Sequence, residues 1–492
     1  MSSFDTERRK IIRNLLLAGF ALPYFVSCST SETENSEEEQ PIQKEDNPEE
    51  LLKSILHSED LDILVKKDTS FEKYTNYYNV HLHKKPQALA LVYNEKGVQK
   101  AIQYARIKGY PVSIRSGGHS FEQFSSNTDG LVINLCLLRN MQWMDEDRIE
   151  IGSGALLQEV YDTLIPKKRM IPMGSCGTVG VGGLTLGGGH GFFSRSYGLT
   201  CDQVESVTFV DGQGKIYNNS KDSELLWALK GGGNGNFGVV TSFVFKTNNL
   251  PNHFGSIRLK ARKLTQEKAK ELLVTYFSVA KKVPQDCYAS YILNSSTLTV
   301  LFTYHSSMQA ELEAIVEPLA EKMEEKKHSF STDLATSLRR YYGSINPLPF
   351  KNASMGYYNG METIEHVIDQ VLDIVIKSKL IFQIVLLGGN IQNKKFEENS
   401  SYPHRDWLFL SELQCYWNSK QTVVRDRKIA AFQEIQKIIF KGGIVSQYRN
   451  YPAMEFEQWE HAYYGENYRH LQKIKRKFDP ENTIRHPQSI KG

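Results

Sequence analysis

Three glycine-rich loops in the first half of the chain place the strongest constraint on its fold. They read RSGGHS at 115–120, GTVGVGGLTLGGGHG at 177–191 and GGNGNFG at 232–238. Glycine accepts backbone conformations and close approaches that other residues cannot. Successive backbone N–H groups in such loops can line a concave anion site. The loops therefore predict a cradle for a group such as pyrophosphate, with tight turns alone as the alternative.

The order of elements around the third loop excludes a Rossmann site. Gly233, Gly235 and Gly238 have the spacing of the dinucleotide fingerprint, which requires a strand before it and a helix after it. Here the helical pattern SELLWALK comes first and the β-branched run VVTSFVF follows. The second loop lacks the Gly-Lys-Ser/Thr ending of a P-loop. Any pyrophosphate site must therefore be built in another way.

Hydrophobic periodicity predicts an α+β chain with two different halves. Residues 50–248 alternate strands and helices, including a helix that ends at Gly109. From about 249 glycine becomes rarer, and an antiparallel sheet backed by helices is expected to about 440. Its predicted helices are 265–283 and 308–327, and its predicted strands are 287–294, 297–306, 379–391 and 407–418. An amphipathic helix and a turn at Asp479 close the chain.

The N-terminus predicts export. Adjacent Arg8 and Arg9 precede an apolar run from Leu15 to Val26, which resembles a twin-arginine signal and is too short for a stable transmembrane helix. The run ends FVSC, typical of a lipoprotein box with Cys28 as the lipidated residue; an ordinary secretory signal is the alternative. We expect a signal over 1–28, a flexible acidic tether over 29–50, and a periplasmic or membrane-anchored lipoprotein.

Charge and cysteine content narrow the possible partners. The net charge of +3 over 492 residues, without a long basic run, argues against nucleic acid. The six cysteines include no CxxC pair, so a zinc site or a thioredoxin-like motif is not expected, and no metal is predicted. If Cys28 is lipidated, an odd number of cysteines remains. This suggests a separate role for one thiol.

Three motifs, taken in order, identify a family resemblance. RSGGHS at 115–120, GSCGTVGVGG at 174–183 and the segment 463–490 together resemble the berberine bridge enzyme-like FAD-linked oxidases of the vanillyl-alcohol oxidase superfamily. The resemblance implies a two-part FAD-binding domain of PCMH type over 51–248. It also implies an antiparallel-sheet substrate domain backed by helices over 249–440, and a C-terminal segment over 441–492 that returns to the FAD domain.

The resemblance implies a flavin held by two covalent bonds, from His119 to the 8α-methyl group and from Cys176 to C6. A neutral imidazole and a thiolate are nucleophilic enough to add to an electron-poor ring. The alternatives are a loop histidine bonded to backbone and a small buried cysteine. The other expected cofactor contacts are Arg115, Ser116, Gly117, Gly118, Ser120, Val179, Gly180, Gly182, Gly183, Gly238, Val240, Asn450 and Asn467.

The chain departs from the family pattern at three positions near these motifs. Gly177 follows the cysteine where proline is usual, and Leu184 follows a glycine pair where histidine is frequent. His190 stands where an aromatic residue is common. None of the three removes an attachment atom, so the departures affect the tuning of the flavin.

The implied reaction is hydride transfer from a substrate carbon to flavin N5 while a base removes a hydroxyl proton. Tyr448 matches the tyrosine of the family's Tyr-x-Asn-Tyr element. Plant relatives place a lysine two residues before a glutamine, where this chain has Glu412 and Gln414. Glu412 is therefore a candidate base, or a proton acceptor for Tyr448. The alternatives are a sheet-facing aromatic for Tyr448 and a solvated carboxylate for Glu412.

The expected function is an exported oxidase of a sugar or oligosaccharide hydroxyl. Relatives with valine at the position of Val179 react with oxygen, so molecular oxygen is the expected acceptor and hydrogen peroxide the product. The first alternative is an oxidase or oxidative cyclase of a polycyclic natural product, such as an alkaloid or antibiotic. The second is a surface lipoprotein that binds a ligand without turnover.

Overall fold

The computed structural model describes residues 47–306, 309–418, 420 and 422–492. One compact unit runs from Pro48 to Gly492. The predicted export signal, Cys28 and nearly all of the predicted tether lie outside the described residues.

The first sheet has the strand order β1-β2-β4-β3 and carries the first glycine loop at the end of β3. Helix α3 follows β2; the Asn94 side chain accepts a hydrogen bond from Gly97 N at its start, and Gly109 ends it at φ 65°. The predicted end of this helix at Gly109 is confirmed. The elements are α2 (Pro48–Leu56), β1 (Leu61–Val65), β2 (Ala88–Val92), α3 (Glu95–Lys108), β3 (Val112–Arg115) and β4 (Leu131–Asn134).

The second sheet has the order β5-β6-β10-β8-β9, and its pairs are antiparallel. Helix α7 precedes the third glycine loop and strand β10 follows it, which confirms the order that excludes a Rossmann site. The elements are β5 (Met141–Trp143), β6 (Arg148–Gly152), α4 (Leu157–Leu164), α5 (Val181–Leu186), α6 (Ser194–Tyr197), β8 (Val204–Asp211), β9 (Ile216–Ser220), α7 (Ser223–Gly232) and β10 (Gly238–Lys246). A two-stranded ribbon pairs β7 (Arg169–Met170) with β11 (Asn248–Asn249).

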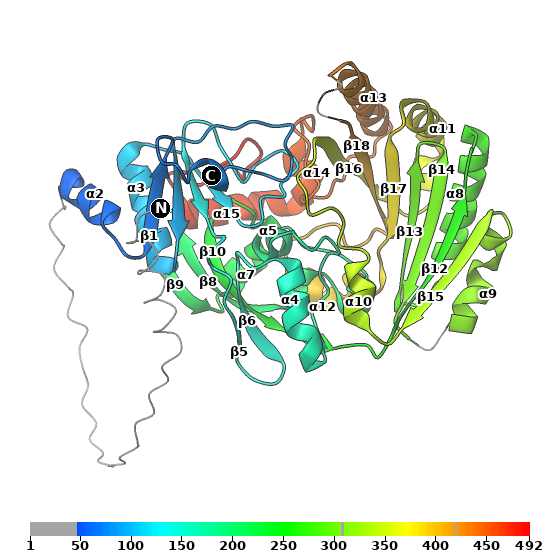
Figure 1. Cartoon of the computed structure of the whole chain (residues 1–492), viewed down its shortest axis with the longest axis horizontal. Coiled ribbons are helices and arrows are strands. Elements are labelled where there is room, and N and C mark those ends of the chain that lie inside the picture. Colours follow the sequence, from blue (N-terminus) through cyan, green and yellow to red (C-terminus); the bar gives the residue numbers. More distant parts are fainter. Residues whose placement is uncertain (1–46, 307–308, 419, 421) are drawn as a thin grey trace, which may run out of the picture. The chain divides into compact units, whose positions relative to one another are not determined.

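The third sheet has seven antiparallel strands in the order β15-β12-β14-β13-β17-β18-β16. Helices α8, α9, α11 and α13 cover one face of it (Figure 1), so the predicted antiparallel sheet backed by helices is confirmed. The strands are β12 (Phe254–Ala261), β13 (Cys287–Asn294), β14 (Thr297–Tyr304), β15 (Glu325–Ser331), β16 (Phe350–Tyr358), β17 (Ile381–Leu386) and β18 (Phe409–Tyr416). The helices are α8 (Gln266–Ala280), α9 (Gln309–Ala320), α10 (Leu334–Arg339), α11 (Met361–Ser378), α12 (Lys394–Glu398) and α13 (Thr422–Lys441).

Two parts of this half differ from the sequence prediction. The helix predicted over 308–327 ends at Ala320, and Glu325–Ser331 forms edge strand β15 against β12. Its polar sequence, EKKHSFS, suits an edge strand, because charged side chains discourage pairing with another chain. Strands β12 and β16 and helices α11 and α13 were not foreseen.

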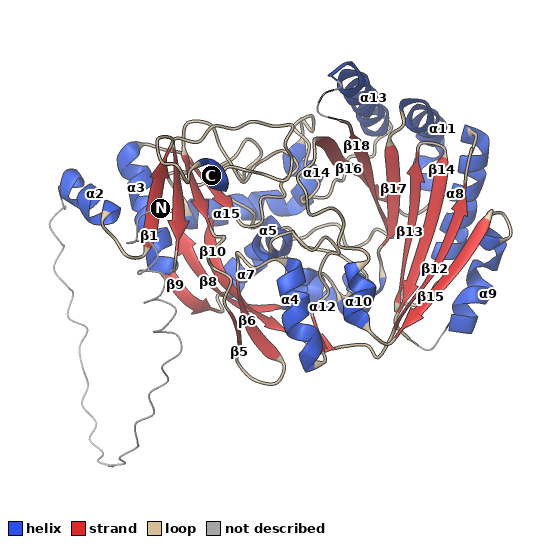
Figure 2. Ribbon diagram, viewed as in Figure 1, coloured by secondary structure: helices blue, strands red, loops and turns tan. Residues whose placement is uncertain are grey.

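The C-terminal segment returns to the first sheet. After α14 (Trp459–Tyr464) and α15 (Tyr468–Phe478), Ile484 forms a parallel bridge with Val112 of β3. Figure 2 shows loops and short helices between the seven-stranded sheet and the two smaller sheets. Among the helices of the described residues, none is long and apolar enough to cross a membrane.

Candidate active site

A cavity of about 650 Å³ brings together nearly all of the predicted site residues. Three parts of the chain form its wall: the glycine loops, the face of the seven-stranded sheet that helices do not cover, and the loop after α13. The predicted residues that line it are Ser116, Gly117, Gly118, His119, Ser120, Cys176, Val179, Gly180, Gly182, Gly183, Gly238, Val240, Glu412, Gln414, Tyr448 and Asn450.

Arg115 and Asn467 lie behind the cavity wall. The Arg115 guanidinium donates to the carbonyl oxygens of Tyr74 and Asn76. The Asn467 amide donates to Ser401 O at 3.1 Å. Neither side chain lines the cavity, and the carbonyl groups that they bind belong to residues outside its lining.

The first two glycine loops touch each other in a way that only glycine allows. A Cβ on Gly117 would lie 2.4 Å from Gly180 N, and one on Gly180 would lie 2.1 Å from Ser116 Oγ. Gly118 adopts φ 74°, a conformation that strains other residues. The backbone of both loops is thus held close together at the cavity wall.

His119 is held by an aromatic ring and a hydroxyl. Its imidazole stacks on Tyr78 with ring centroids 4.0 Å apart and an interplanar angle of 20°. Thr178 Oγ1 lies 3.1 Å from His119 Nε2. Burial, aided by the positive charge of Arg115, lowers the pKa of His119 to about 4. The imidazole is therefore neutral at pH 7.

Cys176 lies in the same wall as His119. Its Sγ is 3.9 Å from Thr178 Oγ1, so Thr178 contacts both residues. The cysteines of the described chain are free: Cys136, Cys176, Cys201, Cys287 and Cys415. Among them, Cys176 alone lines the cavity.

Glu412 lies on β18 and lines the cavity. Alternate residues of a strand share a face, which places Glu412 and Gln414 together. Gln414 Nε2 donates to Glu412 Oε2 at 2.9 Å, and Asn352 Nδ2 lies 3.5 Å from Oε1. Burial raises the pKa of Glu412 to about 7, although both amide donors oppose this shift. The carboxyl group therefore titrates near neutral pH.

Tyr448 accepts two hydrogen bonds at its phenolic oxygen. Gly189 N and Asn450 Nδ2 each donate to it at 3.0 Å. These donors favour the ionised form, but burial has the larger effect and raises the pKa of Tyr448 above its usual value of 10. Tyr448 therefore stays protonated at neutral pH.

The cavity also contains residues that the sequence did not single out. Asn352 of β16 and Gln383 of β17 line it beside Glu412, and Gln383 is the register partner of Glu412. Tyr451 OH lies 3.2 Å from His190 Nε2, so the histidine that departs from the family pattern faces the cavity. Further lining aromatics are Phe124, Phe192, Tyr288, Tyr341, Phe350 and Tyr416.

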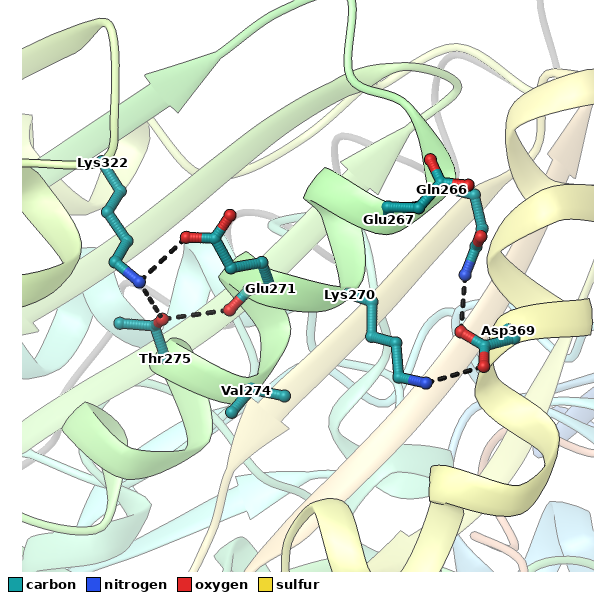
Figure 3. A pocket seen from close by; sticks show the side chains of 8 residues that line it. All are labelled: Gln266, Glu267, Lys270, Glu271, Val274, Thr275, Lys322 and Asp369. Atoms are coloured by element: carbon teal, nitrogen blue, oxygen red, sulfur yellow. Dashed lines mark hydrogen bonds and ion pairs between the residues drawn. The ribbon is translucent and has the colours of Figure 1, made fainter.

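A second hollow, of about 570 Å³, lies on the helical side of the seven-stranded sheet. Figure 3 shows two ion pairs among its charged side chains, while Glu267 has no interaction drawn. Lys270 Nζ pairs with Asp369 at 2.6 Å and Lys322 Nζ with Glu271 at 2.9 Å. With these charges already matched, the hollow offers a ligand little. The described residues contain no cluster of three or more histidine, cysteine or acidic side chains that could hold a metal ion.

Two protein-family models match segments of the chain that line the cavity. The family model described as "FAD binding domain" matches residues 86–220, and the one described as "Berberine and berberine like" matches residues 447–491. Both matched segments contribute to the cavity wall.

Relatives extend the similarity over most of the chain. The uncharacterised FAD-linked oxidoreductase YvdP of Bacillus subtilis is 26% identical over 451 residues, which cover 87% of this chain and 97% of that protein. The chitooligosaccharide oxidase of Gibberella zeae is 26% identical over 443 residues, which cover 84% and 89%.

A solved structure shows the shared fold. The structure of FgChi7B superposes with a TM-score of 0.80 at 23% identity and covers 90% of this chain and 99% of its own. The fold is thus the predicted α+β combination of a PCMH-type FAD-binding domain and a substrate sheet. Together with the two family matches, this makes the chain similar over most of its length to the berberine bridge enzyme-like FAD-linked oxidoreductases.

Proposed function

We propose that this protein is an exported oxidase of a saccharide hydroxyl, with FAD attached through His119 and Cys176 and with Glu412 as the catalytic base. The observation that carries the proposal is the position of Glu412. Its buried carboxyl group, with a pKa near 7, lies in the same cavity as both candidate attachment residues.

The cavity wall fits an FAD molecule. Glycine backbone from two loops lines the cavity, where its N–H groups would donate to a pyrophosphate. A Cβ on Gly183 would meet no atom within 4 Å, so there is open space beside this residue. Ser125 Oγ and Asn234 Oδ1 are buried in the wall and have no hydrogen-bond partner among the described residues. Buried polar atoms normally have partners, so these two suit a polar ligand.

His119 and Cys176 have the chemistry that two covalent attachments require. The low pKa of His119 keeps a nitrogen lone pair free at neutral pH. The contact with Thr178 occupies Nε2 and leaves Nδ1 without a partner among the described residues. Cys176 is partly exposed and lines the cavity, so its sulfur is accessible to a ligand bound there.

Bound FAD supplies the acceptor for a hydride from the substrate carbon. Glu412 takes the hydroxyl proton. Its Oε1 is the better placed oxygen, because the one hydrogen bond that it receives from the described residues, from Asn352, is long. Tyr448 does not serve as the base, because burial keeps it protonated and two donors already occupy its oxygen. Its own O–H is left to donate into the cavity.

The substrate side of the cavity suits a polyhydroxylated molecule. Asn352, Gln383 and Gln414 present amide groups that can donate to and accept from hydroxyls. Aromatic rings such as Tyr288 and Tyr416 line the same side and can stack on the apolar face of a sugar. A chitooligosaccharide oxidase among the relatives adds support.

Val179 lines the cavity and supports oxygen as the electron acceptor. Reduction under anaerobic conditions followed by exposure to air tests this part. We expect rapid return of the oxidised spectrum; reduced flavin that persists for minutes in air would reject oxygen as the acceptor.

The main test measures peroxide release from a panel of sugars and oligosaccharides. Glu412→Gln should lower kcat by a factor of about 10² or more, as expected for loss of a general base. The parent enzyme should gain activity as the pH rises through about 7, where Glu412 ionises. Exposed Glu466→Gln is the control. Turnover of polycyclic aromatic alcohols, but of no sugar, would contradict the proposed substrate class.

Export is a separate part of the proposal and is supported by the sequence of residues 1–28. Replacing Arg8 and Arg9 by lysine should retain the precursor in the cytoplasm. Cys28→Ser should move the protein from the membrane fraction to a soluble fraction. A membrane-bound Cys28→Ser variant would reject the lipid anchor but leave the enzymatic proposal intact.

A further inference from the structure

Arg449 is a buried cation without an anionic partner. The buried arginine and lysine side chains of the described residues are Arg405, Arg449 and Lys475. Arg405 pairs with Asp202 and Lys475 with Asp479, each at 2.6 Å. Arg449 is only 4% exposed, yet no carboxylate in the described part of the chain lies within 4 Å of its guanidinium group. Buried charges are normally paired, so this one requires an explanation.

Neutral groups surround the Arg449 side chain. Nε donates to Tyr464 OH at 2.9 Å, and Nη2 lies 3.0 Å from His486 Nε2. The guanidinium carbon is 5.6 Å from the centroid of the Phe124 ring. Nη1 makes no hydrogen bond to any described residue, while Arg449, Phe124 and His486 all line the cavity. These contacts fix the orientation of the guanidinium but leave its charge unmatched.

Lys84 adds a second positive charge to the same region. Its Nζ lies 5.5 Å from the centroid of Phe124 and donates to the carbonyl oxygen of Gln123 at 2.8 Å. No carboxylate of the described residues lies within 4 Å of it either. Burial lowers the pKa of Lys84 to about 8 although the charge of Glu122 opposes this shift, and a further anion beside Lys84 would favour its charged form.

We infer that Arg449, together with Lys84, supplies the positive charge that binds an anionic group of FAD. The pyrophosphate is one source of that negative charge. The pyrimidine edge of the flavin ring, which gains negative charge on reduction, is the other. Phe124 and Ser125 lie four and five residues after the end of the first glycine loop, which favours the pyrophosphate.

The test requires a protein that exchanges its cofactor. In a His119→Ala/Cys176→Ala background, binding of ADP and FAD is measured by calorimetry at low and moderate salt. Arg449→Gln should weaken ADP binding about tenfold, a loss of about 1.4 kcal/mol. Arg449→Lys should stay close to the parent, because it keeps the charge. Arg469→Gln, an exposed arginine without an ion pair among the described residues, is the matched control.

The two sources give different results. Loss of ADP affinity identifies the pyrophosphate. Unchanged ADP affinity with a lower flavin reduction potential in the holoenzyme carrying Arg449→Gln identifies the pyrimidine edge. If ADP affinity, FAD affinity and reduction potential are all unchanged, the inference is overturned. If Arg449→Gln does not fold, Lys84→Gln takes its place and is judged by the same three readouts.

The inference does not depend on covalent attachment. If the wild-type protein itself exchanges FAD, the proposed covalent bonds are rejected, and the same measurements are made directly on wild-type protein.

Discussion

At the scale of single residues, Thr178 links the two candidate attachment groups. Its hydroxyl oxygen lies 3.1 Å from His119 Nε2 and 3.9 Å from Cys176 Sγ. A bond to Nε2 favours one orientation of the imidazole and leaves Nδ1 as the nitrogen free to react. Thr178 is therefore a positioning residue for His119.

Thr178→Val should reduce attachment through His119, because valine keeps the shape but removes the hydroxyl. In a Cys176→Ala background His119 is the remaining link, so the flavin that stays on the protein after denaturation reports this bond. We expect a smaller flavin-bound fraction by intact mass in Cys176→Ala/Thr178→Val than in Cys176→Ala. Thr275→Val on α8 is the control, because Thr275 is half-buried and does not line this cavity. Equal fractions in both variants would show that Thr178 has no such role.

Glu412 should make the protein less stable at alkaline pH. Its folded pKa of about 7 lies above the ordinary value of 4.5, so the folded state binds a proton that the unfolded state releases. The stability due to the protonated form is complete below pH 4.5 and is lost as the pH rises through about 7. Glu412→Gln removes this loss and should stabilise the protein at pH 8 by up to about 3 kcal/mol.

Denaturant unfolding at pH 5 and at pH 8 measures this effect. The difference between Glu412→Gln and the parent should grow between these two values, while activity falls. A difference that is the same at both pH values would mean that Glu412 ionises normally in the folded protein.

At the scale of elements, the sequence predicted β18 and both of its catalytic candidates. It did not predict Asn352 or Gln383, which complete the network around Glu412. These amides lie on neighbouring strands, and strand register depends on tertiary pairing that periodicity alone does not reveal. The glycine loops were easier to predict from the sequence, because their close backbone approach requires glycine at fixed positions.

Lys351 connects three elements of the site. Its Nζ lies 2.5 Å from Glu122 and 2.8 Å from Glu455. Lys351 belongs to β16, Glu122 follows His119 by three residues, and Glu455 lies in the loop after Tyr448. This ion-pair group joins the seven-stranded sheet to the loop that carries His119.

Lys351→Met should destabilise the protein by roughly 3 kcal/mol, because it leaves the buried Glu122 carboxylate without its partner. Lys351→Met/Glu122→Gln should recover a large part of this loss. Lys377→Met, which breaks an exposed pair with Asp373, should cost less than about 1 kcal/mol. A double-mutant cycle from thermal unfolding gives the coupling; no recovery in the double variant would contradict the pairing as its cause.

At the scale of the whole molecule, the cavity wall is assembled from residues spread between Tyr78 and His486. The hydrophobic core is similarly continuous, since one cluster includes Ile149 of the second sheet and Leu413 of the third. A ligand in this cavity therefore contacts segments that unfolding would separate. FAD should stabilise the FAD-binding part and the substrate sheet together.

Thermal unfolding of the His119→Ala/Cys176→Ala variant tests this coupling. Without flavin it should unfold at a lower temperature than the wild-type protein. Added FAD should raise the midpoint in a concentration-dependent way, with a gain of about 2.7 kcal/mol at a free concentration one hundred times Kd. Because both parts line one cavity, tryptophan fluorescence and far-UV circular dichroism should report a single transition that shifts as a whole. Two transitions, of which FAD shifts only one, would show that the sheets unfold independently.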